Sequence, residues 1–189
     1  MNLKKYVLIS LLAIAAGATI IGIVIMRPDS PPAGIQSAEF RRGILPDSTQ
    51  TTPVHLYFSE RENEFLSAEE RALAHPDNPV FFARSILEAL IKGPQRGLVR
   101  TLPEKTGIRA IYVAQDGICY VDLTASIADY HPGGIKSELL TVYSIANSLV
   151  LNVPEIEAVK ILVNGNESAT LAGHIDLQVP IKANMLLIR

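Results

Sequence analysis

The sequence IRAIYVAQDGICYVDL, residues 108–123, predicts a β-hairpin in the middle of the folded part of the chain. Two runs rich in β-branched and aromatic residues are joined through Asp116-Gly117, a dipeptide that favours a two-residue primed turn. Pairing outward from this turn gives three pairs on one face: Ala114 with Cys119, Tyr112 with Val121, and Ala110 with Leu123. We expect helices to cover this face. The other face then carries Ile111, Val113, Ile118, Tyr120 and Asp122.

A helix is predicted on each side of the hairpin. Before it, Asn78 can cap, Pro79 suits the first helical position, and Gly93-Pro94 marks the stop. The apolar stripe of this helix consists of Val80, Ala83, Leu87, Leu90 and Ile91. After the hairpin, a second helix runs from about residue 135 or 137 to residue 152. Its apolar residues at helical spacing are Ile135, Leu139, Val142, Ala146 and Leu149.

Strands are expected outside the two helices. Residues 54–58 (VHLYF) and 159–163 (VKILV) are β-rich, and Asn164-Gly165 marks a turn into a short return over residues 168–171. Residues 65–74 fit either a short helix or an irregular strand. The order strand, helix, two strands, helix, strand predicts an α+β fold with a small sheet of three to four main strands. Two helices should pack on one face of this sheet, with short extra strands.

The N-terminal end is predicted to anchor the chain in a membrane. Residues Tyr6 to Met26 include no charge over 21 residues, which as a helix spans about 32 Å, against about 30 Å of hydrocarbon. Cleavage after Ala18, in the A-x-A pattern, would leave an apolar run at the new terminus, so we favour an uncleaved anchor. Lys4 and Lys5 should remain cytoplasmic, with everything from Pro28 onward outside.

Composition then divides the chain into three parts. Residues 1–26 are the cytoplasmic start and the anchor, residues 27–53 are a proline-rich flexible tether, and residues 54–189 are the folded domain. Removing Lys4, Lys5 and Arg27 from the net charge of −2 leaves −5 for the exported part. This charge disfavours nucleic acid and acidic membrane surfaces as partners.

Several segments in this order resemble the GerMN domain, which occurs in bacterial sporulation and germination proteins and in other envelope proteins. The stretches that carry the resemblance are residues 54–58, 87–94 (LEALIKGP), 101–104 (TLPE), 137–149 (SELLTVYSIANSL) and 171–177 (LAGHIDL). The resemblance implies an extracytoplasmic module similar to the ring-building motifs of sporulation proteins, without an established catalytic centre. It departs from the best-known member, a lipoprotein with two copies, because this chain has one copy and no lipobox cysteine.

Few residues are candidates for chemistry. His174 and Asp176 stand two residues apart and would share one face of a strand, but a metal site needs a third ligand. His55 and His131 are the only plausible distant partners with an imidazole. In the alternative, structural interpretation, the His174 and Asp176 side chains hydrogen-bond to nearby backbone groups at the end of a strand. Glu138 could bind a ligand or simply favour the start of a helix.

Two further residues have a structural and a functional reading. The hairpin register places Cys119 among apolar neighbours, so a buried, inert thiol is favoured over a nucleophile. Asn147 lies in the middle of the second helix, where it could reach a buried partner or face water. Phosphate-binding glycine loops and a nucleophile-elbow motif are absent from the sequence. We therefore expect neither an enzyme nor a cofactor.

The hairpin face away from the helices is the predicted interaction surface. Its members are Ile111, Val113, Ile118 and Tyr120. These residues either pack under residues 65–74 or face a partner. Glu138, His174 and Asp176 form a second, polar candidate site.

The sequence thus predicts a membrane-anchored, extracytoplasmic, non-catalytic protein-binding or assembly module that binds an envelope protein or a second copy of itself. The alternative is a peptidoglycan or carbohydrate ligand module that assists a cell-wall hydrolase, although the chain has no Trp and is only 6% aromatic.

Overall fold

The computed structural model describes residues 51–62 and 64–189. The predicted anchor and the tether up to Gln50 lie outside these residues, as does the cleavage site considered near Ala18. Within the described part, no helix has both the length and the apolar character that crossing a bilayer requires.

The main sheet has four strands in the order β3-β4-β5-β6. Strands β3 (Ile108–Val113) and β4 (Ile118–Leu123) are antiparallel, and β4 is parallel to β5 (Ala158–Val163). The short β6 (Asn166–Glu167) returns antiparallel to β5. A parallel pair needs a long crossover, which α4 (Ser126–Asp129) and α5 (Ile135–Val150) supply.

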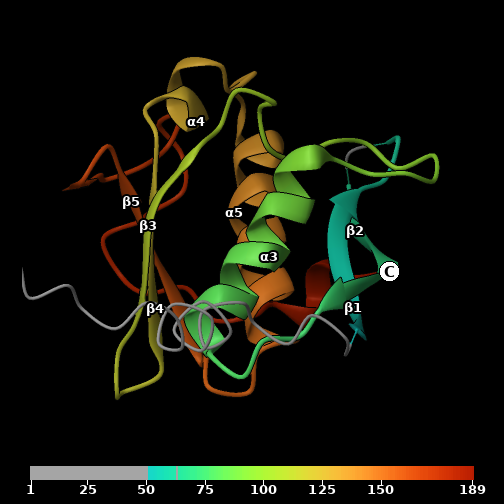
Figure 1. Ribbon diagram of the computed structural model, residues 1–189. Coiled ribbons are helices and arrows are strands. Elements are labelled where there is room, and N and C mark those ends of the chain that lie inside the picture. The colour runs from blue at the N-terminus through green and yellow to red at the C-terminus, as the bar shows by residue number, and fades with distance from the viewer. Residues whose placement is uncertain (1–50, 63) are drawn as a thin grey trace, which may run out of the picture. The chain divides into compact units, whose positions relative to one another are not determined.

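Two helices cover one face of this sheet, as predicted. Helix α3 (Pro79–Lys92) begins where the sequence indicated, because the Asn78 side chain accepts a hydrogen bond from the Val80 N–H at 2.8 Å. Helices α3 and α5 lie side by side against the main sheet (Figure 1). The α+β fold class and the position of both helices are confirmed.

The first strand lies on the other side of the helices, in a sheet of its own. Strand β1 (Thr51–Ser59) pairs antiparallel with β2 (Leu66–Ala74) through all nine residues. The segment left open between helix and strand is therefore a strand. Residues 51–53, which the sequence assigned to the tether, also belong to β1, where Pro53 pairs with Ala72. The helices thus lie between the β1-β2 ribbon and the main sheet (Figure 1).

The predicted hairpin register is wrong by one residue. The loop between β3 and β4 has three residues, because the Ala114 N–H donates to the Ile118 carbonyl (2.9 Å) and the Gly117 N–H donates to the Ala114 carbonyl (3.1 Å). Gly117 has φ +79°, a left-handed conformation that glycine adopts without steric cost. The Asp116 carboxylate accepts from the Ile118 N–H at 3.2 Å and stabilises this wider turn.

The shifted register changes which side chains share a face. Val113 pairs with Cys119 and Ile111 pairs with Val121, and these residues pack toward the helices. The predicted interaction surface of Ile111, Val113, Ile118 and Tyr120 is therefore not one surface. Residues 65–74 do not cover the outer face of the hairpin either, because they form β2 on the far side of the helices.

One apolar core joins both sheets to the helices. Its fully buried members include Phe58 of β1, Ile86 and Leu90 of α3, Ile145 of α5 and Val121 of β4. Cys119 lies in the same core, where burial raises the pKa of its thiol to about 12. The prediction of a buried thiol is confirmed, and this cysteine is held in its protonated form.

Candidate functional site

A buried carboxylate lies at the start of α5. The Glu138 side chain is completely buried, and its Oε1 accepts hydrogen bonds from the N–H groups of Leu171 and Ala172, each at 2.9 Å. Its Oε2 accepts from the His174 N–H (2.9 Å) and from Nδ1 of the His174 ring (3.0 Å). One side chain therefore ties the loop that follows β6 to the helix.

Burial by itself would raise the pKa of Glu138, because it disfavours the charged form. The backbone N–H groups of Ala172 and Ile175, together with the His174 side chain, outweigh this effect and hold the pKa below its usual range. Glu138 is consequently a carboxylate at neutral pH, and His174 presents Nδ1–H to it. The His174 side chain remains 36% exposed.

The structure brings together two of the three predicted polar site residues. Glu138 and His174 are in contact, whereas the Asp176 carboxylate accepts from the Gln178 N–H at 2.8 Å and closes a local turn. The H-x-D pair does not lie on a strand, since residues 171–177 form an irregular loop, so the reasoning that placed both on one strand face is wrong. Across residues 51–62 and 64–189, no three His, Cys, Asp or Glu side chains are arranged to hold a metal ion.

His131 lies near Glu138 but is part of a different chain of hydrogen bonds. Its Nδ1 accepts from the Gly133 N–H (3.0 Å), so its Nε2 carries the proton and donates to Oγ1 of Thr141 (3.0 Å). The Thr141 hydroxyl donates onward to the Thr101 carbonyl at 2.6 Å. Burial lowers the pKa of His131, against the opposing charge of Glu138. This histidine is neutral and structural.

The sequence did not predict that polar side chains of α5 would bind the edge of β1. The Ser144 hydroxyl donates to the Tyr57 carbonyl (2.5 Å), and Oγ of Ser148 accepts from the Tyr57 N–H (3.1 Å). Just after the end of the helix, Asn152 both accepts from the His55 N–H (2.9 Å) and donates to the His55 carbonyl (2.8 Å). The helix thus replaces a neighbouring strand along this edge.

Asn147, which the sequence left open, reaches a buried partner. Its amide oxygen accepts from the Asn184 N–H at 2.8 Å, and its amide nitrogen donates to the Asn184 carbonyl at 3.2 Å. It holds the C-terminal segment against α5. A detectable signal existed in the sequence: Thr141, Ser144 and Ser148 recur every three to four residues, so they share one face of a helix whose other positions from Leu139 onward are mostly apolar.

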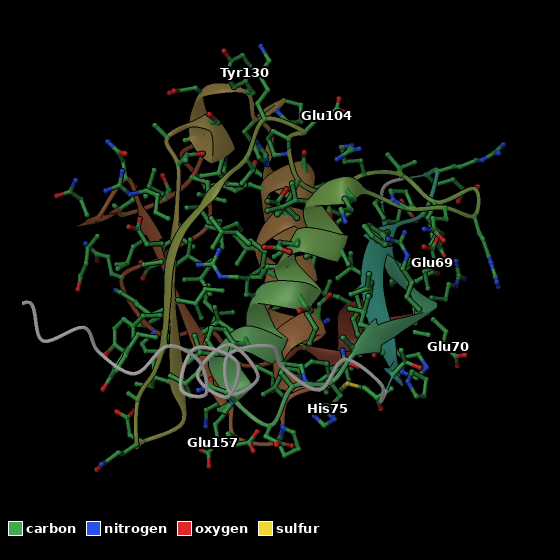
Figure 2. All side chains as sticks on the ribbon, viewed as in Figure 1. Glu69, Glu70, His75, Glu104, Tyr130 and Glu157 are labelled. Atoms are coloured by element: carbon green, nitrogen blue, oxygen red, sulfur yellow. The ribbon has the colours of Figure 1, made fainter. Side chains whose placement is uncertain are left out.

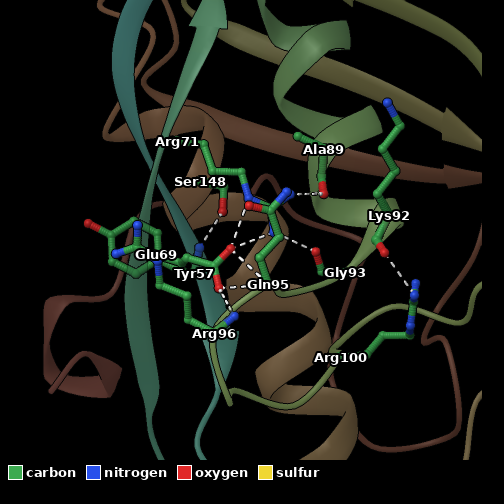
Figure 3. A network of polar contacts seen from close by, with 10 residues as sticks. All are labelled: Tyr57, Glu69, Arg71, Ala89, Lys92, Gly93, Gln95, Arg96, Arg100 and Ser148. Atoms are coloured by element: carbon green, nitrogen blue, oxygen red, sulfur yellow. Dashed lines mark hydrogen bonds and ion pairs between the residues drawn. The ribbon is translucent and has the colours of Figure 1, made fainter.

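A second buried carboxylate, Glu69 of β2, was also not predicted. It is 4% exposed and accepts from Nε and Nη2 of Arg71 at 2.8 and 2.5 Å, and from the N–H groups of Gln95 and Arg96, each at 2.9 Å (Figure 3). Nη2 of Arg71 also donates to the Gly93 carbonyl at 2.6 Å. The ion pair thereby caps the end of α3 and the loop that follows it.

Burial opposes the negative charge of Glu69, but the Arg71 side chain and the backbone N–H groups of Gln95 and Arg96 lower its pKa. Arg100 supports the same helix end by donating to the Lys92 carbonyl at 2.8 Å (Figure 3). The Glu69 cluster and the Glu138 cluster are therefore similar in kind: each uses a buried carboxylate to fasten loop backbone to a helix.

The outer face of the hairpin carries an aromatic pair. Tyr112 is 63% exposed, and its ring centroid lies 6.3 Å from that of Tyr120, its partner across the strands. On the same face Nε of Arg109 donates to the Asp122 carboxylate at 2.9 Å. The low aromatic content of the chain thus does not prevent an exposed pair of tyrosines on this face.

Cavities of moderate size lie elsewhere on the domain. The largest of four, about 620 Å³, lies between the start of α3, the β3-β4 turn and the Pro154 to Glu157 loop. Others of about 210, 300 and 330 Å³ lie beside Leu102, Thr106 and Asp176 respectively. Neither Glu138 nor His174 lines any of these four cavities.

Solved structures of low sequence identity share the fold. A protein from Clostridium perfringens described as a lipoprotein is 21% identical, with a TM-score of 0.51 over 70% of this chain and 87% of that one. The first GerMN domain of the sporulation protein GerM from Bacillus subtilis is 19% identical, with a TM-score of 0.54 over 70% of this chain and 98% of that one.

The tandem GerMN domains of the same GerM protein are 20% identical, with a TM-score of 0.54 over 69% of this chain and 46% of that one. No curated protein sequence matches the chain. The fold neighbours confirm the resemblance to GerMN domains that the ordered segments predicted. The model of the Germane family, described as sporulation and spore germination, matches residues 46–169, and the chain belongs to this family.

Proposed function

We propose that this chain is a non-catalytic protein-binding or assembly module of the bacterial cell envelope, held at the membrane through residues 6–26 with its domain on the outside. The observation that carries this proposal is the use of the two buried carboxylates. Glu69 and Glu138 direct their oxygens to backbone N–H groups of neighbouring loops and to one side chain each.

Such an arrangement supports a rigid scaffold more readily than a reaction centre. A general base must reach a substrate proton, and a nucleophile needs an activated, accessible atom. The Glu138 carboxylate is enclosed, and the thiol of Cys119 is protonated in the core. The groups with perturbed pKa values therefore contribute to packing and loop position. A role in sporulation or germination is what the family description suggests for the process in which such a module acts.

In-membrane crosslinking of the full-length chain, followed by mass spectrometry, tests the proposal. We expect crosslinks to an envelope protein or to a second copy. Capture of peptidoglycan fragments alone would contradict it and favour the alternative below.

The location can be tested separately. A reporter enzyme that is active only outside the cytoplasm, fused after Gln50, should be active, and the N-terminal peptide that includes Lys4 and Lys5 should be retained in the mature protein. Loss of that peptide by cleavage near Ala18 would contradict the anchor.

A peptidoglycan ligand module is the second candidate, favoured by the exposed tyrosine pair on the hairpin. Aromatic faces pack against sugar rings, and Tyr112 and Tyr120 lie next to each other on an open sheet face. Under this alternative, Tyr112→Ala should abolish cosedimentation with purified peptidoglycan. Tyr130→Ala is the matched control, because Tyr130 is 55% exposed and lies at the opposite end of the domain from Glu157 and the hairpin turn (Figure 2).

A further inference from the structure

The β1-β2 ribbon has one closed edge and one open edge. On β1, the residues His55, Tyr57 and Ser59 direct their backbone N–H and C=O groups away from β2. The Asn152 side chain, just after α5, binds His55, and the α5 side chains of Ser144 and Ser148 bind Tyr57. The Val99 backbone binds Ser59 in both directions, at 3.1 and 2.7 Å. Pro53, which has no N–H to donate, stands next in this outward-facing series. The β1 edge is therefore closed from Pro53 to Ser59.

The pairing of the two strands decides which residues of β2 face outward. In an antiparallel ladder, two opposed residues either bond to each other or both point away. Because His55 pairs with Glu70 and Tyr57 with Ala68, Glu70 and Ala68 direct their N–H and C=O groups away from β1. The same alternation assigns Ala72 and Ala74 to the outward set.

The first outward residue of β2 is already occupied. Leu66 accepts a hydrogen bond from the Arg189 N–H at 2.9 Å and forms a parallel bridge with Ile188. Beyond it, the backbone groups of Ala68, Glu70, Ala72 and Ala74 make no hydrogen bond outside the ribbon within residues 51–62 and 64–189. Pro76 then ends the stretch. The open edge is four outward-facing residues long.

This edge lacks the features that protect exposed strands. Native sheets block open edges with bulges, prolines or several charges. From Ala68 to Ala74 the pairing with β1 has no register shift, and the residues whose backbone groups face outward are three alanines and Glu70. All four residues are exposed, and Glu70 points outward from the ribbon (Figure 2). Small side chains allow another backbone to approach closely.

We propose that this open edge of β2 pairs with the same edge of a second copy of the chain. The pairing is antiparallel about a two-fold axis at Arg71, and it forms one continuous sheet in the order β1-β2-β2-β1. This inference rests on the proposed assembly function and names the partner and the contact. Isologous pairing of this kind is the commonest closed form of self-association.

The position of the axis follows from the edge itself. An axis at Arg71 pairs Ala68 with Ala74 and Glu70 with Ala72 of the second copy, so all four outward residues find outward partners. An axis at residue 70 would place the two Glu70 carboxylates opposite each other, which is unfavourable. An axis at residue 69 would bring in Leu66, whose carbonyl is occupied. An axis at residue 72 or 73 would bring in Pro76, which has no N–H. Charge and hydrogen bonding thus select one register.

Register-specific crosslinking of full-length chains in their membrane tests the proposal. Two differently tagged variants, Ala68→Cys and Ala74→Cys, are coexpressed and treated with a short thiol crosslinker. We expect a mixed dimer, because these positions are opposed. Ala68→Cys expressed alone is the control, because its two cysteines lie six residues apart along the strands, roughly 20 Å. The native Cys119 is buried and does not compete.

A second experiment in the same crosslinking background tests the register with charged substitutions. The two-fold axis places residue 72 of each copy opposite Glu70 of the other, so Ala72→Glu creates two repulsive pairs and should weaken association about five-fold. Ala72→Lys creates two attractive pairs and should strengthen association by a similar factor. Absence of the mixed crosslink, equal yield from the single-variant control, or an equal response to both charges overturns the proposal. Should crosslinking then capture a foreign envelope protein, the proposed function stands without this contact; capture of no protein at all removes both.

Discussion

Replacing Glu138 with Gln should destabilise the domain more than any substitution at an exposed carboxylate. The side chain is completely buried and accepts four hydrogen bonds, three of them from backbone N–H groups of residues 171–174. Glutamine has nearly the same shape but only one accepting oxygen. Its NH₂ group would face two donors on His174.

The magnitude follows from the loss of the charge and of two acceptor positions. Glutamine leaves two donors around this buried side chain without an acceptor, and each donor left unsatisfied costs about 1–3 kcal/mol, more when the lost partner was charged. We therefore expect Glu138→Gln to lower the free energy of unfolding by about 3–5 kcal/mol. Glu88→Gln, at an exposed position of α3, is the matched control and should change it by less than about 0.5 kcal/mol.

Hydrogen exchange measured by mass spectrometry locates the effect. In the full-length protein, amides of residues 169–178 should exchange faster in the Glu138→Gln variant, together with a lower melting temperature. The control should leave both unchanged. If Glu138→Gln costs less than about 1 kcal/mol and leaves exchange of this loop as in the parent chain, the buried carboxylate does not hold the loop, and the reasoning is refuted.

Three further predictions concern other parts of the domain. Folding lowers the pKa values of Glu69 and Glu138, so both carboxylates stabilise the folded state fully above the unfolded pKa of 4.5, and this stabilisation is lost as the pH falls through their folded pKa values. The free energy of unfolding, measured from neutral to acidic pH, should fall accordingly. It should fall less steeply in the Glu69→Gln/Glu138→Gln double variant. Ser148→Ala leaves a buried N–H of β1 without its acceptor and should cost about 1–3 kcal/mol in thermal unfolding, against less than about 0.5 for Ser85→Ala on α3. Cys119 should resist alkylation at neutral pH until the chain unfolds, and rapid labelling of the native protein would contradict its burial.

Local signals predicted the helices well because they act over a few residues. Asn78, Pro79 and Gly93 define the ends of α3 through bonds within one turn, so the cap and the stop are visible in the sequence. The hairpin shows the limit of such signals. Asp116-Gly117 correctly indicated a turn, but a two-residue and a three-residue loop share this dipeptide, and a difference of one residue exchanges the two faces of a strand. The predicted surface was wrong for this reason.

The candidate site shows the same division. His174 and Glu138 were both singled out from the sequence, yet their contact joins positions 36 residues apart, and spacing cannot reveal such a pair. Glu69 was missed because an acidic residue in a strand next to Glu70 and Arg71 has the pattern of a solvated surface. Its burial depends on the end of α3 arriving over β2.

The amino-acid sequence alone was sufficient for the two long helices, the order of the main elements, the family resemblance and the net charge of −5 on residues 28–189. These properties depend on composition and on contacts between near neighbours. Tertiary structure alone established that β1 pairs with β2 outside the main sheet and that one edge of β2 is left open within the described residues. It also established that Ser144 and Ser148 of α5, with Asn152 just after the helix, bind the outer edge of β1. The physical reason is that a strand's backbone groups can be satisfied by any suitable partner, and only the packed fold decides which partner comes within hydrogen-bonding distance.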